Sequence, residues 1–248
     1  MLNTLLRRKS FYLWATVLPL LLIQIELGRN LPSQDLLKSG RQALATGNYS
    51  QAEDYLRRSI DRAQAPDADT VLALGELGNL LFIEGRTNEA EPMLDRAINM
   101  VRLNRTLDQR QLPMLLGALG NLYRKTGRFM DSEKTLKEAL QLGTRLLGDT
   151  PEYVADLYND LGALHLAIGN TDKAKKDLKK ALSLIEKKVP DNDPHLATTL
   201  ANLSSLYFTE RKWSLAEPAM LRSLRILEQS LGPEHPDVCT YLDNLGVL

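Results

Sequence analysis

The sequence has little of the chemistry that metal sites and disulfides require. It contains one cysteine, Cys239, and three histidines in 248 residues. A single thiol excludes an internal disulfide and a metal site made of several cysteines. His165, His195 and His235 are spread along the chain and make no recognisable ligand set. We therefore expect neither a metal nor a cofactor.

The chain also lacks net charge, with 31 basic and 31 acidic residues. Residues 1–34 hold four basic residues and one acidic residue, which leaves 27 basic and 30 acidic residues in the rest of the chain. A nearly neutral body with charges of both signs interspersed has no basic stripe for a phosphate backbone. Nucleic acid is therefore not expected as a partner.

Recognisable catalytic motifs are absent as well. No lysine follows a phosphate-binding glycine loop, and neither H-E-x-x-H nor G-x-S-x-G occurs. Acidic residues such as Glu89, Glu91 and Asp95 have the spacing of a solvated helix face. The sequence predicts a protein that is not an enzyme.

The first 34 residues differ from the rest of the chain. Arg7, Arg8 and Lys9 precede an apolar run, FYLWATVLPLLLIQI, at residues 11–25. This order is typical of an export signal, and the run is short for a membrane-spanning helix of about 20 residues. No pair of small residues marks a cleavage site, so a cleaved signal and an uncleaved anchor both remain open. Either predicts a membrane-anchored or secreted protein whose body lies outside the cytoplasm. A cap helix or a transit segment is less favoured, because both would need a polar face.

From residue 35 onward the sequence repeats. A first glycine recurs with spacings of 38 and then 42 residues, becomes serine once, and returns near the end of the chain: Gly40, Gly78, Gly120, Gly162, Ser204 and Gly246. A second marker follows seven residues later in each complete unit: Gly47, Gly85, Gly127, Gly169 and Arg211. Apolar residues such as Leu74, Leu77 and Leu81 lie three and four apart between the markers, which is the spacing of one helix face.

Each unit is predicted to be a pair of helices joined by a turn. The second glycine ends the first helix, because glycine adopts positive φ without strain, and the polar residues after it can cap the next helix. Small residues recur in the second helix and allow close helix approach: Ala52, Ala90, Ser132, Ala174 and Ala216, then Ser59, Ala97, Ala139, Ala181 and Ser223. Stacked units of this kind form a solenoid. Asp193-Pro194 and His235-Pro236, 42 residues apart, are interpreted as helix starts, and His165 as a packing residue.

The repeat resembles the tetratricopeptide repeat (TPR), as in LGALHLAIGNTDKAKKDLKKAL at residues 161–182. The 42-residue period, the AEP of Ala90–Pro92 and Ala216–Pro218, and the LGPEHPDV of Leu231–Val238 are similar to the longer repeats of kinesin light chains and their bacterial relatives. The resemblance implies an all-α, right-handed α-solenoid of antiparallel helix pairs over residues 35–248, with about five pairs and the first helix of a sixth. It also implies a concave surface, lined by the first helices, that binds peptide segments of other proteins.

A peptide-binding stripe can be placed on the first helices. Residues three before, one after and four after the first glycine point away from the packing face. This rule selects amides, aromatic rings and one guanidinium as candidate peptide-binding residues: Asn79, Phe82, Asn121, Arg124, Asn159 and Phe208. An asparagine amide can both donate to and accept from an extended backbone, and an aromatic ring adds buried area.

Two functions remain open on sequence grounds. The first is a peptide-binding adaptor or scaffold, exported or held at a membrane. The second is a structural repeat protein that assembles through its open ends, with itself or with a larger complex. The chain ends soon after the start of a sixth unit, so Leu242, Leu245 and Leu248 have no second helix to cover them. We expect either that the polypeptide is part of a longer array or that this end docks a partner, including another copy of the chain.

Overall fold

The computed structural model describes residues 31–64, 67–148, 150–186, 188–236, 238–239 and 242. It is all-α over these residues, as predicted, with no strand among them. Ten helices are assigned: α2 (Ser33–Ala45), α3 (Tyr49–Arg62), α4 (Ala68–Ile83), α5 (Thr87–Leu103), α6 (Gln111–Lys125), α7 (Phe129–Leu146), α8 (Pro151–Ala167), α9 (Thr171–Ile185), α10 (Pro194–Thr209) and α11 (Trp213–Leu231).

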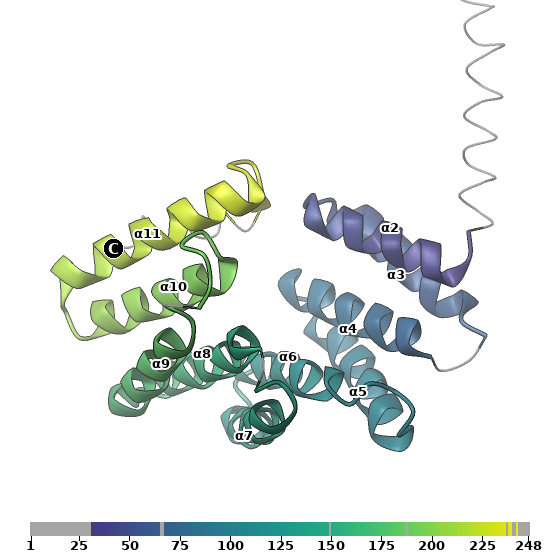
Figure 1. The fold of residues 1–248 in the computed structure, drawn as a ribbon, viewed down its shortest axis with the longest axis horizontal. Helices are drawn as coiled ribbons and strands as arrows, with labels where there is room; N and C mark the ends of the chain where they lie inside the picture. The colour runs from purple at the N-terminus through teal and green to yellow at the C-terminus, as the bar shows by residue number, and fades with distance from the viewer. Residues whose placement is uncertain are drawn as a thin grey trace, which may run out of the picture.

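The helices form five consecutive pairs, from α2 with α3 to α10 with α11, and the pairs stack in order along an arc (Figure 1). Each first helix also contacts the first helix of the next unit, from α2 with α4 to α8 with α10. Second helices make no comparable contacts with one another in the described part of the chain. First helices therefore line the inner, concave side of the arc, and second helices lie outside. The solenoid architecture is confirmed.

The first glycine of each unit lets the two helices of that unit touch. A Cβ atom at Gly120 would lie 2.6 Å from the side chain of Leu136 on the facing helix, so no larger residue fits there without movement. Gly78 and Gly162 face Leu94 and Leu178 at similar distances. In the fifth unit the glycine is replaced by Ser204, which is buried, and a methionine stands at the position of these leucines.

The hydroxyl of Ser204 has a partner in the backbone. Its Oγ donates to the carbonyl oxygen of Ala216 at 2.7 Å. In the third unit the Oγ of Ser132 donates to the carbonyl oxygen of Gly120, also at 2.7 Å. These are the same two positions of the repeat, bridged in opposite directions. Substitution of the first glycine by serine is thus compensated by a buried hydrogen bond.

The turns inside the units have the predicted backbone. Gly85, Gly127 and Gly169 have φ of 78°, and Gly47 has φ of 70°. Arg211, which stands in the fifth unit where the others have glycine, has φ of 57°. A non-glycine residue in the left-handed region carries backbone strain of about 1 kcal/mol. The geometry of the turn has been kept although the residue suited to it has been lost.

The predicted helix start at Asp193-Pro194 is confirmed. Asp193 is the N-cap of α10, and its carboxylate accepts the backbone N–H of His195 at 2.9 Å, while Pro194 occupies the first turn. The small residues predicted for close packing are all buried: Ala52, Ser59, Ala90, Ala97, Ser132, Ala139, Ala174, Ala181, Ala216 and Ser223. His165 is also buried, and its Nδ1 lies 2.7 Å from a carboxylate oxygen of Asp177.

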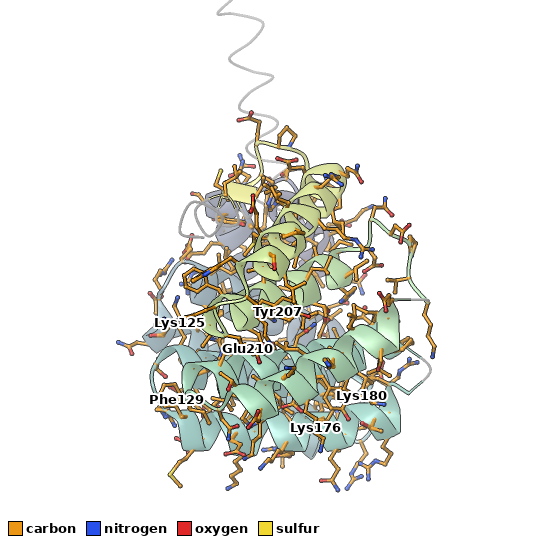
Figure 2. All side chains as sticks on the ribbon, turned by 90° about the vertical axis from the view of Figure 1, so that its left-hand side faces the viewer. Lys125, Phe129, Lys176, Lys180, Tyr207 and Glu210 are labelled. Carbon is orange, nitrogen blue, oxygen red and sulfur yellow. The ribbon has the colours of Figure 1, made fainter. Side chains whose placement is uncertain are left out.

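Ion pairs join successive units near the turns. Arg86 reaches back to Glu53 at 2.8 Å, and Arg128 occupies the same position one unit later, 2.7 Å from Glu91. Further along, the signs are reversed, because Lys175 pairs with Glu210 at 3.3 Å. Figure 2 shows Glu210 at the end of α10, above the lysine-rich α9. Exposed pairs of this kind contribute little to stability, because water and salt screen them.

The curvature brings the two ends of the described solenoid together. A Cβ atom at Gly47, in the turn after α2, would lie 2.7 Å from Cδ of Pro236, which follows α11 (Figure 1). The first unit therefore contacts the segment after the fifth unit, so the arc of helix pairs is nearly closed. Leu242 is 45% exposed, whereas Leu245 and Leu248 lie outside the described residues.

No helix in the described part of the chain is long and apolar enough to cross a membrane. The predicted signal or anchor at residues 11–25 lies outside the described residues and stays a prediction.

Candidate functional site

The concave face is built by a repeated contact between neighbouring first helices. The residue three positions before the first glycine of one unit contacts the residue five positions before the first glycine of the next unit. Gly75 meets Leu115, since a Cβ at Gly75 would lie 2.8 Å from Cδ2 of that leucine. Gly117 faces Leu157 in the same way, at 3.0 Å. The glycines leave the space that these leucines fill.

The same contact is polar between α8 and α10. Asn159 replaces the glycine and Thr199 replaces the leucine, and Nδ2 of Asn159 donates to Oγ1 of Thr199 at 2.8 Å. Asn159 is only 1% exposed. Its amide is therefore directed into the interface between two helices, and its Oδ1 is buried without a hydrogen-bond partner among the described residues.

A hollow opens on the concave face between α4 and α6. Its volume is about 140 Å³, and its lining is mostly apolar: Val71, Leu72, Gly75, Glu76, Asn79, Gln111, Met114, Leu115 and Ala118. A wider hollow of about 420 Å³ lies between α2 and α4, lined by Gln34, Leu37, Lys38, Arg41, Gln42, Asp69 and Leu72. Leu72 lines both hollows, so they adjoin at this residue, and the two together, called the groove below, extend across three first helices.

Charges at this groove are paired across units. Nε of Arg41 lies 3.0 Å from a carboxylate oxygen of Glu76. Burial raises the pKa of the Glu76 carboxyl above its ordinary value, and Arg41 opposes that rise. The pair lies at the border between the two hollows, so one ion pair spans the groove there.

The equivalent pair two units later joins α6 to α8. Nδ2 of Asn121 donates to a carboxylate oxygen of Asp160 at 2.7 Å, and Nε of Arg124 donates to Oδ1 of Asn121 at 3.4 Å. Burial raises the pKa of Asp160 to about 7, while the hydrogen bond from Asn121 lowers it. Burial also lowers the pKa of the Arg124 guanidinium. Asn121 and Arg124 are therefore members of a network on the concave face.

A third polar pair, between α8 and α10, was missed by the sequence reasoning. A carboxylate oxygen of Asp156 lies 2.7 Å from Nδ1 of His195. The hydrogen bond that His195 donates to the Asp156 carboxylate raises the pKa of His195, and burial raises the pKa of Asp156. His195 was interpreted as a turn residue from its place after Asp193-Pro194. The sequence signal available was an acidic residue and a histidine on the first helices of adjacent units, at positions that face each other when the units stack.

The other candidate residues lie apart. Asn79 is exposed at the rim of the hollow between α4 and α6. Phe82 is half-buried against the main core. Phe208 is half-buried on α10, with its ring edge-on to Trp213 and 4.9 Å between centroids. Peptide binding by all six candidate residues stays a prediction, and in this structure Asn159 does not reach the surface of the groove.

The described residues include no cluster of three or more His, Cys, Asp or Glu side chains that could hold a metal ion. What the concave face offers is a set of apolar surfaces, amides and carboxylates suited to non-covalent binding.

Comparison with solved structures gives the same architecture. BtubC (BKLC) from P. vanneervenii is 23% identical with a TM-score of 0.59, over 79% of this chain and 80% of that chain. A putative kinesin light chain with nearly identical TPR-like repeats from Podosopora anserina is 14% identical with a TM-score of 0.56, over 81% of this chain and 98% of that chain. A Rap protein complexed with Competence and Sporulation Factor is 16% identical with a TM-score of 0.70, over 90% of this chain and 67% of that chain. Because these sequence identities are all below 25%, the structural similarities establish the fold alone.

No curated protein matches the chain significantly by sequence. Family models do match it, and all three describe the tetratricopeptide repeat, at residues 37–104, 111–187 and 196–237. Together they span three of the five described helix pairs in full and most of the other two. The chain belongs to the tetratricopeptide-repeat family, and such repeats support a role as a protein-interaction scaffold.

Proposed function

We propose that this protein is a non-enzymatic adaptor that holds a peptide segment of a partner protein in the groove across α2, α4 and α6. The observation that carries the proposal is the pair of adjoining hollows that share Leu72. An extended segment needs apolar surface for its side chains and hydrogen-bonding groups for its backbone. The groove supplies apolar surface at Leu72 and Met114 and a hydrogen-bonding amide at Asn79.

A similar fold is known to hold a bound factor. The Rap protein with the TM-score of 0.70 was solved in complex with Competence and Sporulation Factor. That complex supports the idea that a solenoid of this shape can bind another molecule. That complex does not identify the partner of this chain, and the chemistry of the partner is inferred from the residues of the groove.

The test is site-specific photo-crosslinking in the organism that makes the protein. A photo-reactive amino acid at Met114, which is 48% exposed on the groove, should capture a partner. The same amino acid at Met130, which is 87% exposed at the start of α7, is the matched control and should not capture it. Equal capture at both positions, or capture only at Met130, would contradict binding in the groove.

The proposal includes a location for the protein. The basic-then-apolar order of residues 7–25 supports export or membrane anchoring, with the solenoid outside the cytoplasm. Fractionation of cells producing the full chain should place it in the membrane or in the secreted fraction. Recovery of the intact chain, with residue 1 or 2 at its amino terminus, wholly from the soluble cytoplasm would refute this part.

Self-assembly is the second candidate function. The exposed Leu242 beyond α11 supports it, because an exposed apolar side chain can pack against a second copy of the chain. It predicts that the mass of the protein in sedimentation rises with concentration and that Leu242→Glu abolishes the rise. A constant monomer mass at all concentrations would eliminate this candidate and leave the groove as the binding surface.

A further inference from the structure

The structure points to a specific anchor within the groove. We propose that the hollow between α4 and α6 receives one uncharged apolar side chain of the bound segment, about the size of leucine or phenylalanine, and that Gln111 accepts a backbone hydrogen bond beside it. This inference rests on the proposed function and adds the chemistry of the partner.

Size supports an apolar side chain of this class. The hollow measures about 140 Å³. An apolar cavity of about 150 Å³ is known to hold a benzene-sized molecule, so a branched aliphatic side chain or a phenyl ring fits here. The walls are the side chains of Leu72, Leu115 and Met114, with Gly75 and Ala118 at the floor and edge.

The hollow exists because one position of the repeat carries alanine. At the positions equivalent to Ala118 stand Glu76, Asp160 and Asn202. Glu76 and Asp160 each cross the groove to the preceding first helix, where Arg41 and Asn121 bind them. The methyl group of Ala118 cannot make that crossing to Asn79. The space stays open and the Asn79 amide stays exposed to a ligand.

A second position of the repeat leaves an acceptor without a donor. Oε1 of Gln111 is buried and has no hydrogen-bond partner among the described residues. At the equivalent position in the fifth unit, His195 bonds to Asp156 of the preceding first helix. The residue equivalent to Asp156 on α4 is Leu72, which has no polar group to offer. A buried carbonyl oxygen without a partner is destabilising, so a rotation of the Gln111 side chain that brings Oε1 to a ligand's donor in the hollow is favoured.

The donor that fits both features is a backbone N–H. An extended segment carries N–H groups at regular intervals, and the side chain next to such a group can enter the adjacent hollow. A charged side chain would lose its hydration among apolar walls, and the nearby Glu76 carboxylate is already paired with Arg41. An uncharged apolar side chain therefore satisfies the site better than lysine or aspartate.

The interface between α8 and α10 is built differently. There His195 bonds to Asp156 at the positions of Gln111 and Leu72, and Asn159 bonds to Thr199 at the positions of Gly75 and Leu115. Competition for these polar groups would break existing hydrogen bonds, whereas Gln111 and Asn79 have none to lose among the described residues.

The test uses a displayed library of random 12-residue peptides selected on the full chain in a non-ionic detergent. Enriched peptides should share a leucine, isoleucine, methionine or phenylalanine at one fixed position. Ala118→Leu, which fills the hollow from α6, should weaken binding of these peptides at least about tenfold. Asn202→Leu changes the equivalent residue on α10 and is the matched control, with binding expected within about twofold of the native chain.

The acceptor is tested separately at Gln111. Gln111→Leu removes Oε1 and should weaken binding about threefold to tenfold, while its melting temperature stays equal or rises. Gln111→Glu keeps an acceptor and should retain more of the affinity than Gln111→Leu. Retention of full affinity in Gln111→Leu would refute the hydrogen bond.

The outcomes separate the anchor from the general proposal. If peptides bind and Met114→Ala or Asn79→Ala weakens them, but Ala118→Leu has no effect and no apolar position is enriched, the anchor is wrong and groove binding stands. If no peptide is enriched, or binding ignores every groove variant, both the anchor and the proposed function fail.

Discussion

The two halves of the concave face use the same repeat in opposite ways. Between α4 and α6, Gly75 and Leu115 make a close apolar contact, and a hollow stays open beside them. Between α8 and α10, Asn159 and Thr199 occupy the same two positions and are joined by a hydrogen bond of 2.8 Å. The backbone is alike in both places, so the difference lies in the side chains.

The comparison shows how a repeat protein makes one part of its surface open and another part closed. The core positions of every unit are occupied by small residues and leucines, and these keep the helix pairs alike. Residues that face the next first helix are free to vary, provided that each pair remains complementary in volume or polarity. Binding surface and stiff scaffold can therefore lie in neighbouring units of a single fold.

The largest effect should come from placing the polar residue of the α8–α10 interface in the neighbouring α6–α8 interface, where Gly117 and Leu157 occupy the same two positions. Gly117→Asn would put a Cβ atom 3.0 Å from Cδ2 of Leu157 and should lower the free energy of unfolding by about 1–3 kcal/mol. Gly117→Asn with Leu157→Thr recreates the pair found between α8 and α10 and should recover part of the loss. Chemical denaturation of the two single variants and the double variant measures the coupling. Simple additivity would show that the two contacts are not equivalent.

A smaller effect is expected at Asp160, where the pKa of about 7 lies above the ordinary value of 3.8. The folded chain thus holds a proton between pH 4 and 7 that the unfolded chain has released, and stability conferred at low pH is lost as the pH rises through this window. Asp160→Asn keeps an oxygen that can accept from Asn121. We expect it to raise the free energy of unfolding by about 1–2 kcal/mol at pH 8 and to change it little at pH 4. A gain that is the same at both pH values would argue against a raised pKa.

The smallest effect should arise at the turn of the fifth unit. Arg211→Gly places glycine at φ of 57° and relieves the strain, so stability should rise by about 0.5–1 kcal/mol. Gly169→Ala makes the reverse change at φ of 78° in the fourth unit and should lower stability. Thermal unfolding of both variants tests the comparison. Loss of stability in Arg211→Gly would mean that the arginine makes a contact stronger than the strain.

Much of this architecture could be predicted from the sequence, because the repeat reports local geometry. The glycine turns at 47, 85, 127 and 169 and the buried leucines between them follow from helix periodicity and positive φ. Even Arg211 was placed correctly, since its position in the period outweighs its side chain.

The state of each groove residue could not be predicted in the same way. Asn79 and Asn121 are equivalent in the repeat, yet Asn121 is bonded to Asp160 whereas Asn79 faces Ala118. That difference depends on the residue two positions before the glycine of the next unit. Asn159 was assigned to the groove surface but is buried, because Thr199 provides a hydrogen-bond partner where the preceding units have leucine. A repeat position considered by itself does not reveal which residue of the next unit will pair with it.

Binding of a peptide in the hollow between α4 and α6 can be measured directly through the methyl groups of methionine side chains. Met114 lies in the hollow, Met130 is exposed on α7, and Met220 is buried in the fifth unit. In a carbon-13 methyl spectrum of the full chain, a selected library peptide should shift the Met114 signal and leave Met130 and Met220 in place. An unchanged Met114 signal at saturating peptide, or a larger shift of Met130, would contradict the account.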